Sequence, residues 1–207
     1  IPMELKYLGE GPYPLDKNRI SWVTIQHSKE AKEGSINIYD INTHENKSYK
    51  CPGRPGFAFP TTKEGVFITG LDHTIGLFNI ADLSYEVIAE CDPHIETNRM
   101  NDAWLFDGGM LFGKYDWEHN KSCCLWLYRY SDKKVIKLLD GIVCSNGMII
   151  KGKGDIVTLY YIDSFVYTVR KFELDVKQGK LSDPVEIIKI TGENEYPDGM
   201  IESPDGK

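Results

Sequence analysis

Five short stretches combine a possible oxygen ligand or a turn-forming residue with the start of an apolar strand. In chain order they are Glu10-Gly11, Pro55-Gly56, Asn101-Asp102-Ala103, Asn146-Gly147 and Asp198-Gly199. Four of the five offer a carboxylate or a carboxamide oxygen, and none offers His or Cys. Oxygen donors of this kind, brought to one point, suit a hard or borderline divalent cation. Asn-Gly and Asp-Gly are also common turn dipeptides, so turn formation is an alternative explanation at each position.

Other chemically active side chains give weaker indications. Arg99 lies two residues before Asn101, where its guanidinium could bind a substrate hydroxyl or carboxylate; the alternative is an ordinary surface arginine. The five histidines, among them His119 in DWEH, are interpreted as structural or solvated. No Gly-x-Ser-x-Gly sequence appears.

The elements that must position these residues are predicted to be β-strands. Short runs rich in β-branched and aromatic residues, such as ISWVTI, GVFITG and TLYYID, alternate with Gly, Asp, Asn and Lys clusters. The five stretches recur every 44 to 52 residues, and about four strands fit into each interval. This period is typical of a β-propeller blade. The alternative, an irregular β-sandwich with evenly spaced turns, fits the regular spacing less well.

The repeat count predicts an all-β protein with about four blades and the start of a fifth at Asp198. We expect one propeller domain over residues 1–207, truncated at its C-terminal side relative to a larger ring. An open arc of blades exposes unpaired sheet surfaces, so we expect these 207 residues to be unstable by themselves.

Composition excludes several classes of protein. The net charge of −7 argues against nucleic-acid binding, which needs clustered Lys and Arg. No apolar run is long enough for a membrane span, and the start shows no signal peptide. The five cysteines lack a CxxC spacing and are interpreted as reduced, structural thiols, which favours a cytoplasmic protein.

Four motifs, in order, resemble those of the senescence marker protein/gluconolactonase/luciferin-regenerating family. LGEGPYP resembles its LGEGPVW start, NRMNDAW its N-R-x-N-D-G, CSNGMII its S-N-G, and YPDGM its P-D-G-M. The segment LYYIDSFVYTVRKFELD also resembles the family's YYIDS region. The resemblance covers nearly the whole chain and implies a six-bladed propeller, of which nearly two blades are missing here.

The resemblance also implies roles for individual residues. It places one divalent cation (Ca²⁺, Zn²⁺, Mg²⁺ or Mn²⁺) on Glu10, Asn146 and Asp198. Substrate contacts fall on Arg99, Asn101 and Glu118, although Asp116 competes with Glu118 because that alignment needs a gap. Asp102 matches the family's Asp after the substrate-contacting Asn.

The chain departs from the family pattern at three places: Pro14 replaces a Trp, Ala103 replaces a Gly, and Gly113-Lys114-Tyr115 replaces Gly-Thr-Met. The last two changes adjoin the substrate side, so they affect the identity of the substrate more than metal binding.

The expected function is metal-dependent hydrolysis of a sugar lactone, with Asp198 as the catalytic residue that orients or deprotonates the attacking water. Two alternatives stay open. One is a non-catalytic calcium-binding or regulatory propeller, and the other is a metal-dependent hydrolase of aryl esters or phosphotriesters on the same fold. The sequence does not identify the metal, the lactone or the oligomeric state.

Overall fold

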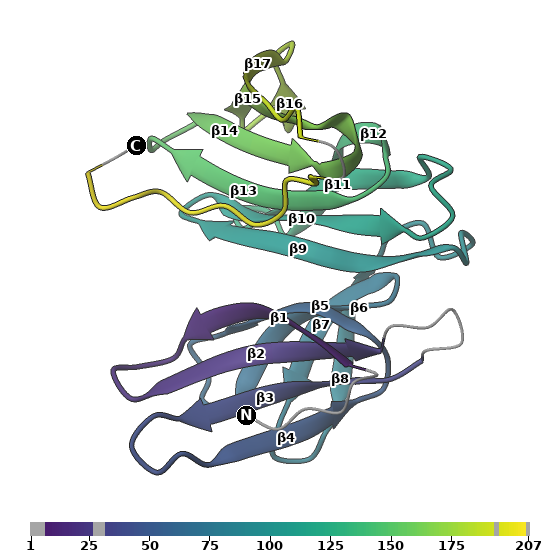
Figure 1. The fold of residues 1–207 in the computed structure, drawn as a ribbon. Coiled ribbons are helices and arrows are strands. Elements are labelled where there is room, and N and C mark those ends of the chain that lie inside the picture. Colours follow the sequence, from purple (N-terminus) through teal and green to yellow (C-terminus); the bar gives the residue numbers. More distant parts are fainter. Residues whose placement is uncertain (1–6, 27–31, 193–194, 206–207) are drawn as a thin grey trace. The chain divides into compact units, whose positions relative to one another are not determined.

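The computed structural model describes residues 7–26, 32–192 and 195–205. The described residues form seventeen strands and one short 3₁₀ helix, so the predicted all-β class is confirmed (Figure 1). The strands group into four sheets, each built mainly as an antiparallel meander of four strands. The chain divides into two compact units, residues 1–100 and 101–207, and each unit contains two sheets. The expectation of one domain over 1–207 stays a prediction.

The first unit holds two four-stranded sheets. Their strands are, in order, β1 (Tyr7–Pro14), β2 (Arg19–Gln26), β3 (Gly34–Asp40) and β4 (Asn46–Cys51), then β5 (Pro55–Pro60), β6 (Val66–Leu71), β7 (Thr74–Asn79) and β8 (Tyr85–Glu90). A core that includes Val23, Ile36, Phe67 and Phe78 joins the two sheets.

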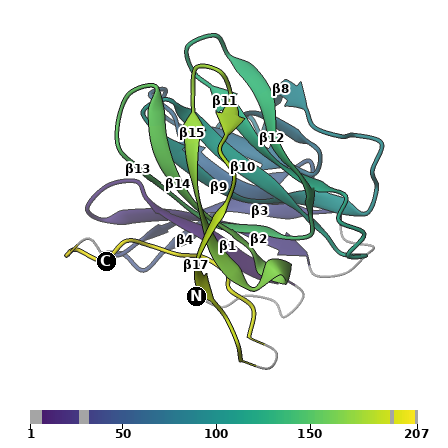
Figure 2. The ribbon, with the colours of Figure 1, turned by 90° about the horizontal axis from the view of Figure 1, so that it is seen from above.

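The second unit repeats the pattern, apart from the first residues of β9, which lie before residue 101. The strands of its first sheet are β9 (Asn98–Phe106), β10 (Gly109–Asp116), β11 (Cys123–Arg129) and β12 (Lys134–Ile142). Those of its second sheet are β13 (Ser145–Lys151), β14 (Ile156–Asp163), β15 (Thr168–Asp175), β16 (Lys180–Leu181) and β17 (Val185–Lys189), with η1 (Ser164–Val166) after β14 (Figure 2). Both β16 and β17 pair with β15.

Strand position within a sheet explains the residue types. The central strand β6, VFITGL, is buried along its whole length, and its residues are mostly apolar or β-branched. The outer strand β4, NKSYKC, is largely exposed and polar. Because an inner strand packs on both faces while an outer strand meets water, apolar runs identify the inner strands.

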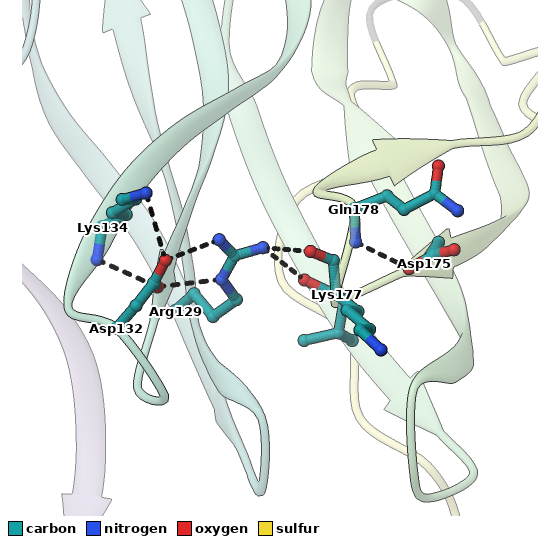
Figure 3. Close-up of polar contacts among 7 residues, drawn as sticks. Arg129, Asp132, Lys134, Asp175, Lys177 and Gln178 are labelled. Atoms are coloured by element: carbon teal, nitrogen blue, oxygen red, sulfur yellow. Dashed lines mark hydrogen bonds and ion pairs between the residues drawn. The ribbon is translucent and has the colours of Figure 1, made fainter.

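An arginine clamp links the two sheets of the second unit (Figure 3). Arg129, at the end of β11, donates from Nε and Nη2 to the two carboxylate oxygens of Asp132 at 2.9 and 2.7 Å. Its Nη1 donates to the carbonyl oxygens of Val176 and Lys177, in the turn that follows β15. The hydrogen bond with Arg129 holds the pKa of Asp132 well below its usual range. One guanidinium therefore ties the turn of one sheet to the turn of the next.

The segment 195–205 was expected to open a further blade, and in the structure it forms no strand. It runs extended beside β13, as the yellow trace in Figure 1 shows. Gly147 N–H donates to the Asp198 carbonyl at 3.1 Å, and Lys151 pairs with Glu202 at 2.8 Å. The contacts advance four residues on each side in the same direction, so the segment runs parallel to β13. This single backbone hydrogen bond is not enough to make the segment a strand paired with β13.

No helix among the described residues has the length and apolarity that a membrane crossing requires.

Candidate functional site

Three of the predicted positions lie on β-bulges in the first strand of their sheet. The register shifts between Glu10 and Tyr13 in β1, between Pro55 and Phe57 in β5, and after Asn146 in β13. The sequence suggested turn formation as an alternative at each of the five stretches, but Glu10, Asn101 and Asn146 all lie within strands. A bulge turns a side chain out of the regular alternation, and bulges are common beside active sites. The glycine at each bulge is therefore part of a strand and does not form a turn.

Gly147 has a steric role in the bulge of β13. A Cβ at this position would lie 2.7 Å from the Asp198 carbonyl oxygen and 2.8 Å from the side chain of Ile162. Only a glycine lets the segment with Asp198 approach β13 this closely. At the matching bulge in β1, Gly11 has a φ of +56°, which also favours glycine.

Asn146 is the centre of a hydrogen-bonded cluster. Its side chain is buried, and its Nδ2 donates to the Ser164 hydroxyl at 2.8 Å. Its Oδ1 accepts from Asn101 Nδ2 at 3.0 Å, and the same Asn101 nitrogen donates to the Ser145 carbonyl at 2.9 Å. Asn101 therefore holds the carboxamide of Asn146 in a fixed orientation.

Ser164 connects this cluster to Asp198. Its hydroxyl donates to the Pro197 carbonyl at 2.7 Å while it accepts from Asn146. The Gly147 N–H also donates to the Asp198 carbonyl. The peptide groups before and after the Asp198 Cα are therefore each held by a hydrogen bond. The Asp198 side chain itself is exposed to solvent.

Asp102 contributes a second carboxylate near Asp198. Desolvation of this half-buried group raises its pKa to about 6; a hydrogen bond from the Ala103 N–H at 2.9 Å opposes the rise, and the charge of Asp198 adds to it. A carboxylate such as Asp102, whose charged form is disfavoured by desolvation and by a neighbouring negative charge, is a setting in which a bound cation is stabilising.

The structure thus brings Asn101, Asn146 and Asp198 together in the second unit. Glu10 and Arg99 belong to the first unit, and their parts in the site stay predictions. Glu10 is half-buried. Arg99 donates from Nη1 to the Met100 carbonyl at 2.8 Å.

Glu118 and its rival Asp116 have different settings. Glu118 is exposed in the loop after β10, and its role as a substrate contact stays a prediction. Asp116 is fully buried, and its carboxylate accepts from the backbone of Glu118, Asn120 and Ser122 and from the Ser122 hydroxyl. Desolvation opposes these hydrogen bonds, yet they hold the pKa of Asp116 below its ordinary value. Asp116 is thus engaged in ordering its loop.

The cysteines fit structural roles better than nucleophilic ones. All five cysteines are free and buried in the structure, and burial raises the pKa of Cys51 to about 12. The Cys144 sulfur accepts weak hydrogen bonds from the side chains of Asn101 and Asn146. His27 lies outside the described residues. No group of three or more His, Cys, Asp and Glu that could hold a metal occurs in the described part of the chain, so a cation here would need the carboxamides.

Sequence reasoning missed Ser164 as the connector, although it is the Ser of the quoted YYIDS stretch. Its neighbour Asp163 is buried and caps the turn by accepting from the N–H groups of Cys144 and Phe165. A buried Asp-Ser pair at the end of an apolar strand is the signal that could have indicated this role.

Comparison with known proteins shows that the chain is similar to regucalcins and to a lactonase-like protein. A model of the SMP-30/gluconolactonase/LRE-like region matches residues 8–207. Regucalcin of Xenopus laevis is 31% identical over 196 residues, which are 86% of this chain and 64% of that protein. YvrE of Bacillus subtilis, whose assignment as a sugar lactone lactonase is provisional, is 26% identical over 93% of this chain and 64% of its own. In regucalcin of Oryctolagus cuniculus the match spans half of the relative's length.

Two solved structures show the fold. A luciferin-regenerating enzyme superposes with a TM-score of 0.78 at 21% identity, over 96% of this chain and 66% of that one. A calcium-binding protein, regucalcin, from Agrobacterium tumefaciens gives 0.79 at 19% identity, over 96% and 65%. The predicted propeller fold is thereby confirmed.

Proposed function

The chain belongs to the SMP-30/gluconolactonase/LRE-like family, and from this premise we propose that it acts in the metal-dependent hydrolysis of sugar lactones. One observation supports the proposal most. An exposed carboxylate, Asp198, is anchored through its backbone to the buried carboxamide of Asn146 and lies near a second carboxylate, Asp102. A carboxylate that is open to water and whose backbone is held beside oxygen ligands suits a general base in the hydrolysis of a cyclic ester.

The residues of the second unit fit a divalent cation. Carboxylate and carboxamide oxygens are the ligands of hard cations, and a cation would favour the charged form of Asp102, which desolvation and the charge of Asp198 disfavour. Asn146 and Asp198 would hold it, and Glu10 is the third ligand that the family pattern adds. When bound, such a cation polarises a carbonyl and makes water more acidic.

The protein's own residues have distinct roles in this proposal. Asp198 accepts a proton from the attacking water and returns it to the ring oxygen that leaves the carbonyl carbon. Asn101 orients Asn146 through the hydrogen bond at 3.0 Å. Arg99, Asn101 and Glu118 are proposed to bind the hydroxyl groups of the sugar.

The test is hydrolysis of δ-gluconolactone by the purified protein in Ca²⁺, Mg²⁺, Mn²⁺ or Zn²⁺, and again after chelation with EDTA. We expect activity that depends on the cation and a fall in kcat of roughly 10²-fold or more for Asp198→Asn. Asp107→Asn is the matched control, because Asp107 is also an exposed aspartate before a glycine and lies in the β9–β10 turn. An Asp198→Asn enzyme with wild-type turnover contradicts the assigned role.

The two other functions predict different results in the same assay. A purely calcium-binding protein binds the cation and hydrolyses neither lactones nor esters. A metal-dependent esterase hydrolyses aryl esters or phosphotriesters faster than the hydroxylated lactone.

A further inference from the structure

Five residues in the second sheet of the second unit form a polar row on one face of three neighbouring strands. Ser145 of β13 is paired with Asp163 of β14, and Asp163 is paired with Thr168 of β15. One step further along the same strands, Tyr161 is paired with Arg170. Residues that are paired across antiparallel strands, or lie two apart along one strand, point to the same face of the sheet. These five residues are called the polar row below.

The polar row faces the other sheet of the same unit. Tyr161 belongs to the core that joins the two sheets, together with Leu111 of β10 and Leu125 of β11. The Ser145 hydroxyl lies against the backbone of Gly113 in β10, where an added Cβ would overlap it. The row is therefore enclosed between two packed sheets.

Four polar atoms of the row are buried without a protein partner. Three are the hydroxyl groups of Ser145, Tyr161 and Thr168, residues that are 0%, 0% and 3% exposed. The fourth is the Nε of Arg170. Within the described part of the chain, no protein atom forms a hydrogen bond with any of the four. Unpaired polar groups of this kind are rare in protein interiors, and a bound water molecule or ion commonly supplies the partner.

The members of the row lie close enough to influence one another. Desolvation raises the pKa of Tyr161 well above its ordinary value, and the charge of Asp163 adds to the rise. The Ser145 hydroxyl, which lies near without a direct hydrogen bond, and the charge of Arg170 oppose it. The Arg170 guanidinium also lies over the Tyr161 ring, with 5.6 Å between its Cζ and the ring centroid. Both charges of the row are thus near the same hydroxyl group.

These charges indicate the kind of ligand that the row can hold. An anion is disfavoured beside the buried carboxylate of Asp163, and a cation is disfavoured beside the guanidinium of Arg170. The hydroxyl groups can each donate and accept a hydrogen bond, whereas the Arg170 Nε only donates. A small neutral molecule that both donates and accepts therefore suits all four atoms. Water has these properties and is small enough for a closely packed interior.

We infer that internal water molecules bind along the polar row, between the two sheets of the second unit. They accept a hydrogen bond from the Arg170 Nε and bridge the three hydroxyl groups. The site lies directly behind the strand that carries Asn146: the Ser145 carbonyl accepts from Asn101 Nδ2 at 2.9 Å, while the Ser145 hydroxyl faces the row. Bound water thus supports the start of β13 from the inner side of the sheet, whether or not the protein hydrolyses a lactone.

The direct test is a high-resolution crystal structure of the protein and of Tyr161→Phe, which removes one hydroxyl group and keeps the ring. In the wild type we expect ordered water within hydrogen-bonding distance of the Ser145 and Tyr161 hydroxyls. We expect the variant to lose the water that contacts residue 161. A wild-type structure in which the four atoms of the row contact only protein atoms overturns the inference.

Thermal unfolding, measured by calorimetry, gives a second readout whose sign separates the two cases. If water completes the hydrogen bonds of Tyr161, the hydroxyl stabilises the fold, and Tyr161→Phe lowers Tm by roughly 2–4 °C. Thr168→Val, which replaces a hydroxyl by a methyl group, is expected to lower Tm in the same way. If these hydroxyls are buried with no partner at all, their removal raises Tm, and this result also overturns the inference.

Tyr85→Phe is the matched control for the water site. Tyr85 packs against the core of the first unit, and its hydroxyl has a protein partner, the Thr74 Oγ1 at 2.9 Å. Its substitution is expected to lower Tm while the water between the sheets of the second unit stays in place. Loss of that water in Tyr85→Phe as well contradicts a site that depends on the polar row.

Discussion

At the residue scale, the contacts of Asn101 indicate a positioning role in addition to the substrate contact that the family pattern implies. Its Nδ2 group points at Asn146 and Ser145, so within the second unit it acts as a positioning residue for a proposed cation ligand. A partner of this kind fixes which atom of the ligand side chain faces the metal.

We therefore expect Asn101→Ala to raise the Kd for Ca²⁺ by roughly tenfold or more, since loss of such a partner commonly weakens metal affinity by that factor. Calorimetric titration of the chelator-stripped protein measures the change. Asn37→Ala is the control: Asn37 is a buried carboxamide of β3 with its own hydrogen bonds, and its loss is expected to reduce stability and leave the Kd unchanged. An unchanged Kd in Asn101→Ala contradicts the positioning role.

Asp102 gives a pH-dependent prediction at the same scale. Its pKa of about 6 in the folded protein exceeds its ordinary value of 3.8, mainly through desolvation. The folded state therefore binds the proton of Asp102 more tightly than the unfolded state does. Protonation of Asp102 stabilises the fold fully below pH 3.8, and this stabilisation declines as the pH rises to about 6. Asp102→Asn removes this decline. In EDTA, we expect the variant to exceed the wild type in unfolding free energy at pH 7 by about 1–3 kcal/mol, and by less at pH 5.

Urea unfolding at the two pH values measures this difference, with Asp107→Asn as an exposed control in the turn of the same hairpin. A variant whose advantage is the same at pH 5 and pH 7 contradicts the assignment of the titrating group to Asp102.

At the scale of elements, the apolar runs predicted most inner strands and did not indicate the outer ones. ISWVTI, GVFITG and TLYYID correspond to β2, β6 and β14. The outer strand β4 is polar and largely exposed, and β8, YEVIAE, mixes apolar and charged residues at exposed and half-buried positions, so neither was among the apolar runs. Their conformation is imposed by pairing with the neighbouring strand, which is a tertiary effect.

The same limit explains what the sequence could predict of the site. Spacing identified Asn101, Asn146 and Asp198 as residues at equivalent places in successive sequence repeats. It did not predict the bulges, because a register shift depends on the partner strand and leaves only a glycine in the sequence. It also did not predict the contacts of Ser164, which join residues more than 15 positions apart in the chain.

The arginine clamp allows a prediction for the second unit. Arg129→Lys keeps the charge but loses the planar fork that reaches Asp132 and two carbonyl oxygens together. We expect a fall in Tm of roughly 2–4 °C, measured by calorimetry. Arg19→Lys is the matched control, because Arg19 pairs with Asp16 at the same i,i+3 spacing in a more exposed setting. Its substitution is expected to shift Tm by less than about 1 °C, and equal shifts in both variants contradict a clamp.

At the scale of the whole molecule, β17 exposes several apolar side chains together. Val185, Ile187 and Ile188 are 55%, 43% and 54% exposed along one strand of five residues. Neighbouring exposed apolar residues on an outer strand favour association between chains.

We expect residues 1–207 to self-associate through this strand, and Ile188→Lys to reduce the association. Light scattering coupled to size-exclusion chromatography measures the mass of the particles. Val87→Lys is the control, since Val87 is 51% exposed on the outer strand β8 without an adjacent apolar surface of the same extent, and it adds the same charge. A monodisperse wild-type monomer contradicts this expectation.

The parallel run of residues 195–205 beside β13 has a consequence for how the site is assembled. The segment is held there by the hydrogen bonds to Asp198 and Pro197 and by the pair of Lys151 with Glu202. Each of these contacts can open without disturbing the hydrogen-bond ladder between β13 and β14. Asp198 is therefore subject to a local docking equilibrium that is separate from global unfolding. The amide proton of Gly147 reports this equilibrium directly, because its exchange with solvent requires that the segment leave β13.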